Sequence, residues 1–259
     1  MSAFEKSNPT LITFPPSLDC ELARFLLAHY GVRHSEEPHA FIFSFFVTLW
    51  HAHTVIFPVL YGDSVALVGP WAIAEFFDRR CAKNLCLIPN TTRERRQLAS
   101  DWLLFSQTLA FATARFAYYH LLPHRDIMTR PLSLGAPSYE SRIVAAGYPI
   151  FSAALSRLLS LSEEKSLDSL EQVRTVFNWV DIRLSFSKGY LVGDRLSLSD
   201  ISFAVAAAPV VMPAEYGGAI PNLGEMPLAM KAVIKEMREH PAGHFALRIY
   251  AQCRGHQPS

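Results

Sequence analysis

The segment from Phe57 to Asp78, FPVLYGDSVALVGPWAIAEFFD, constrains the fold more than any other part of the chain. Its Gly62-Asp63 pair stands between two short apolar runs, which is typical of a β-hairpin turn. Pro70 suits the first position of a helix because proline has no N–H to leave unpaired. Pro58 opens the first run although proline cannot donate to a strand ladder, which indicates a special turn or a cis peptide bond. The segment therefore predicts strand, turn, strand and helix.

The preceding residues predict a strand–helix–strand unit. Residues 11–14 form an apolar run that Pro15-Pro16 ends, and residues 18–30 carry apolar side chains at helical spacing. Gly31 follows, at the position where glycine commonly ends a helix. Residues 32–35 begin a second strand. With the Phe57 segment, the order is β-α-β followed by β-β-α.

This order resembles the thioredoxin-like domain of the glutathione transferase superfamily. That family places an arginine in the first helix, a leucine three residues later and a glycine seven residues later, and Arg24, Leu27 and Gly31 match. It opens the third strand with a valine–cis-proline pair, whose place Phe57-Pro58 takes here. The resemblance implies an α/β thioredoxin-like domain followed by an all-α domain.

The rest of the chain favours that second, helical domain. The polar, charged link at residues 79–96 suggests a boundary, so we predict a thioredoxin-like domain at 1–84 and a helical one at 85–259. Apolar side chains at three- and four-residue spacing predict a long helix around residues 98–116, followed by helical tracts at 139–161 and 170–184.

The strongest single match is YLVGDRLSLSDISFA, which ends at Ala204. Ser197 stands three residues before the carboxylate of Asp200 and ahead of an apolar run, which resembles a helix capping box with Asp in place of Glu or Gln. The segment is similar to the start of the buried sixth helix of the family. Met226-Pro227 and His240-Pro241 are similar to its last helical hairpin, so the resemblance extends from about residue 11 to residue 250.

The resemblance implies that Ser17 is the catalytic residue, at the N-terminus of the first helix. Free N–H groups at such an end stabilise a thiolate, to which a serine hydroxyl can donate. The alternative is that Ser17 only caps the helix. Cys20 matches the second cysteine of glutaredoxin-like members, but it can equally be a small buried hydrophobic residue, and Asp19 beside it opposes thiolate formation.

The resemblance also implies residues for glutathione. Phe57 and Pro58 would leave a backbone edge for the cysteinyl part of the ligand. Gly69-Pro70 stands where the family has a Glu-Ser pair that holds the charged γ-glutamyl end, and it has neither a carboxylate nor a hydroxyl group. Of the groups at this helix start, we expect only the N–H of Trp71 to donate a hydrogen bond to an anion. We therefore expect glutathione as cofactor with weakened or lost affinity.

An apolar run replaces the polar second helix of the family. Residues 39–62 contain no Asp, Glu, Lys or Arg. The part from Ala40 to Thr54 can be extra core or dimer surface, the wall of an apolar cleft, or a membrane-facing patch. His51, His53 and Pro58 interrupt the run, so we expect no transmembrane span. The candidate substrate-binding residues, some of which would be core instead, are Phe14, Phe105, Ala112, Arg115, Tyr118 and Tyr119.

Composition narrows the possible partners. The formal net charge is +1, so no overall field favours nucleic acid. The four cysteines show neither zinc spacing nor a disulfide framework, and we expect no metal site at His51 and His53. No signal sequence is evident, and we expect a cytoplasmic protein. Because 50% of the residues are hydrophobic, we expect a homodimer or an apolar cleft.

These features lead to two functional hypotheses. The first is a glutathione-transferase-like enzyme that acts on a lipophilic small molecule, with a lyase, isomerase or cyclisation reaction favoured by the Gly69-Pro70 replacement. The second is a non-catalytic ligand-binding or interaction protein with the same fold. Retention on glutathione resin would separate the two hypotheses.

Overall fold

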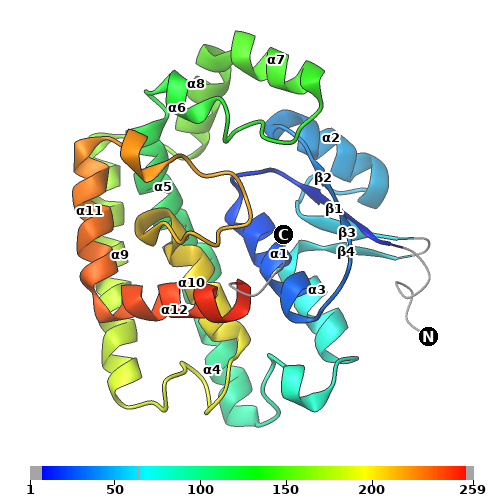
Figure 1. Ribbon diagram of the computed structural model, residues 1–259, viewed down its shortest axis with the longest axis vertical. Coiled ribbons are helices and arrows are strands. Elements are labelled where there is room, and N and C mark those ends of the chain that lie inside the picture. The colour runs from blue at the N-terminus through cyan, green and yellow to red at the C-terminus, as the bar shows by residue number, and fades with distance from the viewer. Residues whose placement is uncertain (1–7, 63–64, 255–259) are drawn as a thin grey trace. The chain divides into compact units, whose positions relative to one another are not determined.

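The computed structural model describes residues 8–62 and 65–254, which form two compact units. The first unit contains the chain up to Leu85 together with Asp126–Phe151 and Gly217–Pro221. The second contains Cys86–Arg125, Ser152–Tyr216 and the chain from Asn222 onward. Figure 1 labels their helices and strands.

The first unit is built on a four-stranded sheet in the order β2-β1-β3-β4. Its strands are β1 (Thr10–Thr13), β2 (Ser35–Pro38), β3 (Val59–Tyr61) and β4 (Ala66–Val68). The pair β1–β2 is parallel, and the pairs β1–β3 and β3–β4 are antiparallel. The predicted turn residue Asp63 lies outside the described residues, but the N–H of Gly62 donates to the carbonyl oxygen of Val65 over 3.0 Å, which confirms the hairpin.

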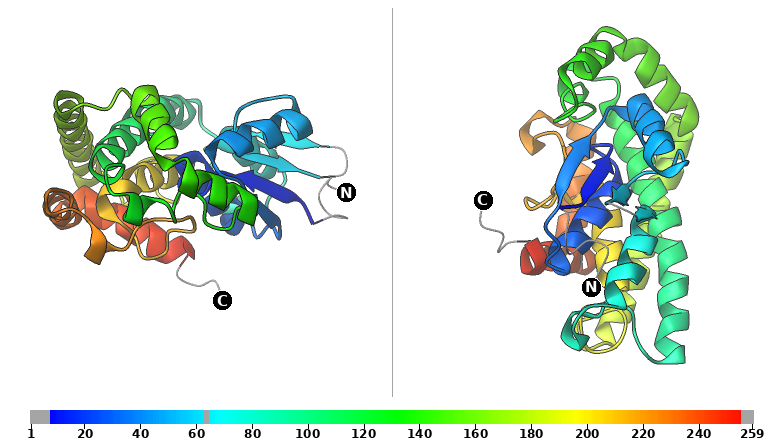
Figure 2. Two further views of the ribbon diagram at one scale, coloured as in Figure 1. Left: turned by 90° about the horizontal axis from the view of Figure 1, so that it is seen from above. Right: turned by 90° about the vertical axis from the view of Figure 1, so that its right-hand side faces the viewer.

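Three helices pack on this sheet: α1 (Leu18–His29), α2 (Phe41–Ala52) and α3 (Gly69–Asp78). A short 3₁₀ turn, η1 (Lys83–Leu85), follows them. Helix α1 packs on α3, whereas α2 contacts β1, β3 and β4 (Figure 2). Gly31 ends α1 in the left-handed region, at φ +66°, as predicted. The β-α-β and β-β-α plan is therefore confirmed.

The first unit includes two later segments outside the predicted range 1–84, and each of them is hydrogen-bonded to the N-terminal part of the unit. The first of these segments, Asp126–Phe151, contains most of α6 (Arg125–Met128), all of α7 (Ser138–Ala146) and the start of α8 (Tyr148–Leu158). The fully buried Glu140 of α7 accepts the N–H of Ala40 at 2.9 Å and lies 2.8 Å from Nδ1 of His39. Similarly, the N–H of Gly217 donates to the carboxylate of Glu21 in α1 at 3.0 Å.

The second unit is helical. Helices α4 (Thr92–Trp102) and α5 (Ala110–Leu121) are joined without a break by the π-helix η2 (Leu103–Leu109) into the long helix that the sequence predicts. Around α10 (Leu198–Val211) lie α4, η2, α5, α11 (Leu228–Glu239) and α12 (Pro241–Arg254). The unit also contains the later part of α8, from Ser152, together with α9 (Glu163–Ser185) and η3 (Leu223–Glu225). Helix α10 is apolar on all sides, as expected for a central buried helix.

The start of α10 has the predicted capping box. The fully buried carboxylate of Asp200 accepts hydrogen bonds from the backbone N–H of Ser197 at 2.7 Å and from its hydroxyl at 2.6 Å. It also accepts the N–H of Leu191 at 2.7 Å. One side chain therefore satisfies donors from both the helix start and the loop before it.

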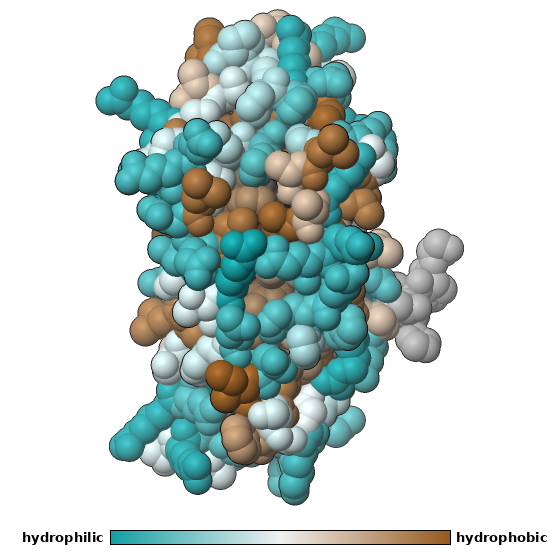
Figure 3. All heavy atoms as spheres, turned by 90° about the vertical axis from the view of Figure 1, so that its left-hand side faces the viewer, coloured by the Kyte–Doolittle hydropathy of each residue, from teal (hydrophilic) through white to brown (hydrophobic). Residues whose placement is uncertain are grey.

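The face of the molecule that carries α11 is mixed in polarity. Figure 3 shows the face that carries α11, where hydrophobic residues form separate patches among hydrophilic ones. Within residues 8–62 and 65–254, no helix combines the length and the apolar composition that crossing a membrane requires.

Candidate functional site

Ser17 lies at the N-terminus of α1, directly after the turn that follows β1. Its N–H donates to the carbonyl oxygen of Phe14 at 3.0 Å, and its backbone is extended, with φ −70° and ψ 129°. Its Oγ accepts the N–H of Cys20 at 3.4 Å, so the residue is the N-cap. The side chain is partly exposed. A hydroxyl in this position faces the positive end of the helix dipole and remains accessible to a ligand.

The thiol of Cys20 is part of the core. The residue is fully buried, and its Sγ accepts the N–H of Phe14 at 3.4 Å. Burial raises the pKa of this thiol to about 12 although Arg24 and Ser17 act in the opposite direction. A thiol that stays protonated is a poor nucleophile. The structure therefore favours the buried hydrophobic interpretation of Cys20 over a redox role.

Asp19 is a second titratable residue next to Ser17 and Cys20 at the start of α1. It belongs to the first turn of α1 and keeps contact with solvent. Crowding by protein atoms removes water from around the carboxyl group and raises its pKa to about 6. A carboxyl group that titrates near neutral pH can exchange protons with a ligand at this helix end. The sequence shows only an acidic residue in a first helical turn, which is a common and unspecific pattern.

The peptide bond between Phe57 and Pro58 is cis, one of the two arrangements that the sequence suggested. Pro58 is buried, and Phe57 is partly exposed at the start of β3. The carbonyl oxygen of Pro58 accepts the N–H of Gly69 at 2.8 Å. This bond connects the opening of β3 to the N-terminus of α3.

The start of α3 has few groups with which to hold an anion. Gly69 and Pro70 are both buried, and Val68 before them supplies no side-chain cap. Gly69 has φ +77°, a conformation that glycine adopts more readily than other residues. Its N–H is already bonded to Pro58, and Pro70 has none. The helix therefore begins without the carboxylate, the hydroxyl and the two N–H groups that a polar residue pair would supply.

Four phenylalanine rings gather beside Ser17 and Pro58. We call Phe14, Phe41, Phe45 and Phe57 the aromatic cluster. The ring of Phe57 lies 5.9 Å from that of Phe14 and 5.5 Å from that of Phe45, and Phe41 lies 5.3 Å from Phe14. Phe41 and Phe45 are four residues apart and project from the same side of α2. This spacing was visible in the sequence, but the partners of the two rings were not.

A comparison of sequences and a comparison of structures both relate the chain to glutathione S-transferases. Residues 141–241 match the family model of the glutathione S-transferase C-terminal domain. A glutathione S-transferase from Sinorhizobium meliloti is similar to the chain at 18% identity and a TM-score of 0.58, with 93% of each chain covered. This is the glutathione S-transferase fold. It confirms the predicted thioredoxin-like domain and helical domain.

Other solved structures with the glutathione S-transferase fold have different activities in their names. The β-etherase LigF from Sphingobium sp. is 15% identical, with a TM-score of 0.59 over 93% of this chain and 99% of LigF. Glutathione S-transferase-I, determined with lactoylglutathione, is 16% identical, with a TM-score of 0.57 over 94% of this chain and 100% of that one. No curated protein sequence matches the chain. At such identities the likeness shows the fold and no particular activity.

Two of the predicted substrate contacts in the helical unit of this glutathione S-transferase fold are core residues instead. Phe105 is 0% exposed and packs its ring against Phe203, and Ala112 is 1% exposed. Both face the interior of the unit, because α10 covers the side of η2 and α5 on which they lie. This corrects their assignment as residues that contact a substrate.

The other three candidates on α5 keep surface that a ligand could use. Arg115 is partly exposed, donates to the carbonyl oxygen of Leu159 at 3.0 Å and lies over the ring of Phe111. Tyr118 and Tyr119 are partly exposed as well. Desolvation raises the pKa of Tyr118, so its hydroxyl stays protonated at neutral pH and can donate a hydrogen bond.

Two pockets in the helical unit are lined by residues other than the predicted site residues. One, of about 210 Å³, has Leu87, Thr91 and Val192 in its lining, and the other, of about 550 Å³, has Leu223, Ile234 and Arg238.

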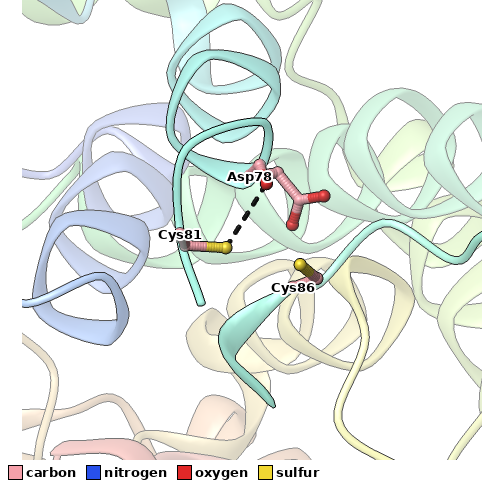
Figure 4. Close-up of side chains that lie close together, drawn as sticks. All are labelled: Asp78, Cys81 and Cys86. Atoms are coloured by element: carbon pink, nitrogen blue, oxygen red, sulfur yellow. Dashed lines mark hydrogen bonds between the residues drawn. The ribbon is translucent and has the colours of Figure 1, made fainter. Parts of the chain in front are cut away.

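The four cysteines are free thiols, and Cys81 donates to the carbonyl oxygen of Asp78 at 3.3 Å at the end of α3 (Figure 4). The candidate site is thus the group of residues around Ser17, Pro58, Gly69 and the aromatic cluster.

Proposed function

We propose that this protein is a glutathione-transferase-like enzyme that acts on a lipophilic small molecule, with the Ser17 hydroxyl as the catalytic group. The observation that carries the proposal is the position of Ser17: it caps α1, stays accessible, and is joined through Phe14 to the ring of Phe57 and to cis-Pro58. A hydroxyl at a helix N-terminus can donate to a thiolate or to an anion that develops during a reaction. Phe57 and Pro58 would align the ligand along the edge of β3.

The polarity of the site supports a lipophilic substrate. The aromatic cluster includes Phe14, whose carbonyl oxygen accepts the Ser17 N–H, and no residue of α2 carries an acidic, lysine or arginine side chain. Aromatic rings supply large apolar contact area with defined geometry. Arg115, Tyr118 and Tyr119 are the proposed substrate contacts of the helical unit. Phe14 is only 4% exposed and packs in the core of the first unit, so it is not proposed as a substrate contact.

Glutathione is the proposed cofactor, with reduced affinity. Gly69 and Pro70 give its charged end neither a carboxylate nor a hydroxyl partner, and a lost charge-assisted hydrogen bond costs about 1.5–3 kcal/mol. A specialised reaction such as bond cleavage, isomerisation or cyclisation fits this site better than general conjugation. The name β-etherase shows that a protein of this fold can act on ether bonds.

A second candidate function is non-catalytic binding of an apolar ligand. It is favoured by the hydrogen bond that the Ser17 hydroxyl oxygen accepts from the Cys20 N–H, which gives this side chain a sufficient structural role.

The proposal also includes a cytoplasmic location and a homodimer. Sedimentation velocity would test the dimer, because a monomer near 29.0 kDa at micromolar concentration would contradict it.

One experiment separates the two candidates. The wild-type chain is applied to glutathione resin, and a panel of apolar electrophiles and aryl ethers is assayed with and without free glutathione. Retention, elution by free glutathione and glutathione-dependent turnover support the enzyme. Absence of both retention and turnover, together with tight binding of an apolar dye, supports the binding protein.

A further inference from the structure

Helix α2 exposes four of its large apolar side chains to solvent. Only Ser44 and Thr48 of this helix are buried, and their hydroxyls donate to the carbonyl oxygens of Phe41 and Phe45 in the same helix. Exposed hydrophobic residues lie on one side of α2, and we call them the α2 apolar face: Ile42, Phe46, Leu49 and Trp50, with 39%, 65%, 48% and 82% of their surface exposed. Their spacing of four, three and one residues places them within about 100° of the helix circumference.

The exposed hydrophobic surface continues beyond the helix within the first unit. Val55 and Ile56, in the loop after α2, are each 57% exposed. The ring of Phe43 contacts that of Tyr139 on α7 at 5.9 Å, and Tyr139 and Ile143 of that helix are exposed too. Exposed large apolar side chains that gather in one unit mark a contact with a partner or a membrane.

The face is held in a defined shape. His53 ends α2 in the left-handed region at φ 51°, and the N–H of Ile56 donates to the hydroxyl of Thr54 at 3.1 Å. The ring of His51 stacks on that of Tyr61 in β3, with 4.3 Å between the ring centres. The apolar side chains at this end of α2 are therefore presented by an anchored helix and loop.

We propose that the α2 apolar face inserts into the surface of a lipid bilayer, so that the protein binds membranes peripherally. The shape favours lipid over a protein partner: a tryptophan that is 82% exposed at a helix end protrudes, and a fluid acyl layer accommodates a protrusion without a matching groove. Tryptophan and phenylalanine are also side chains that reside at membrane interfaces.

The charges around the face agree with a lipid surface. Residues 39–62 contain no aspartate or glutamate. The exposed Arg142 lies on α7 between Tyr139 and Ile143. Anionic headgroups would therefore meet no acidic residue on α2 and one basic residue beside it. The main interaction is apolar, so binding should depend little on ionic strength.

The test uses the full chain and phosphatidylcholine vesicles with and without phosphatidylglycerol, at low and high salt. Wild type is expected to co-sediment with vesicles of both compositions and to stay bound at high salt. Phe46→Ser/Trp50→Ser should lower the partition coefficient about tenfold or more, because two large apolar side chains leave the acyl layer. Phe46→Leu/Trp50→Phe keeps the apolar character and should keep the binding.

A matched control removes equally exposed apolar side chains from another helix. Ile182 of α9 and Phe186, the C-cap of that helix, are 62% and 88% exposed, and Ile182→Ser/Phe186→Ser should leave the partition coefficient within about twofold of wild type. The proposal is overturned if wild type binds neither vesicle composition or if both serine variants lose binding equally. It is also overturned if Phe46→Ser/Trp50→Ser only changes the oligomeric state in lipid-free sedimentation, since the face would then be a protein interface. None of these results depends on glutathione.

Discussion

The backbone N–H of Gly69 donates to the carbonyl oxygen of Pro58 over 2.8 Å, so the first amide of α3 is used inside the fold. The next residue, Pro70, has no N–H. The helix end that would hold the charged part of glutathione thus loses one donor to an internal bond and another to proline. Gly69 is also in the left-handed region, at φ +77°, so a larger residue at this position would be strained.

Replacement of Pro70 alone should strengthen glutathione binding. Pro70→Ser restores an N–H and a hydroxyl at the helix start without altering Gly69, and we expect about a tenfold gain in affinity. Pro70→Ala restores the N–H only and should give a smaller gain. Titration calorimetry on the three proteins measures both effects. Low-micromolar affinity already in the wild type would show that other groups hold the ligand.

Removal of the Ser17 hydroxyl should reduce turnover while the fold is retained. Ser17→Gly is the most informative variant, because glycine at an N-cap costs only a few tenths of a kcal/mol whereas alanine costs about 1 kcal/mol. The loss of a hydrogen bond to a developing anion should lower kcat about 10²–10³-fold. Cys20→Ser is the paired variant and should keep most of the activity, since this thiol is buried and protonated. Loss of turnover in Cys20→Ser alone would assign the chemistry to the thiol instead.

Asp200→Ala should destabilise the protein strongly without affecting ligand binding. It leaves the two Ser197 donors and the N–H of Leu191 without their buried acceptor, so we expect a loss of about 3 kcal/mol or more in the free energy of unfolding. Asp168→Ala, at an exposed position of α9, is the matched control and should change stability by less than about 0.5 kcal/mol. Urea unfolding of both variants measures the difference, and equal stability would refute the role of the capping box.

His29 should make the first unit less stable in acid. Its Nε2 lies 2.8 Å from the carbonyl oxygen of Leu85, which requires an N–H there, and desolvation lowers the pKa of the ring below 6.5. The unfolded chain then binds the proton more readily than the folded chain. Stability is therefore lost as the pH falls below 6.5 and through the lower folded pKa.

The measurement is the free energy of unfolding between about pH 5 and pH 8. The free energy of unfolding of the wild type should decrease as the pH falls, with a slope that corresponds to uptake of up to about one proton by His29 on unfolding. His29→Gln should reduce that slope. An unchanged slope in His29→Gln would assign the acid sensitivity to other groups. His120, whose pKa is lowered by desolvation too, is the first of these to replace.

Local patterns in the sequence were sufficient for the scaffold. Gly31 at φ +66°, the start of β3 directly after Pro58, and the Ser197–Asp200 pair at the start of α10 were all predictable. Each depends on the conformation of one residue or on hydrogen bonds within one helical turn. The backbone allows few alternatives at such positions, so the residue type alone carries the information.

Burial and long-range contacts were decided only by the tertiary structure. The helical pattern of α2 did not reveal that Phe41 and Phe45 join Phe14 and Phe57 whereas Trp50 faces solvent, because large apolar residues lie on more than one side of this helix. No local signal pairs Glu140 with His39, which is 101 residues away in the chain. A sequence pattern specifies which residues share a face of a helix, but the face that is covered depends on the elements packed against it, and these come from distant parts of the chain.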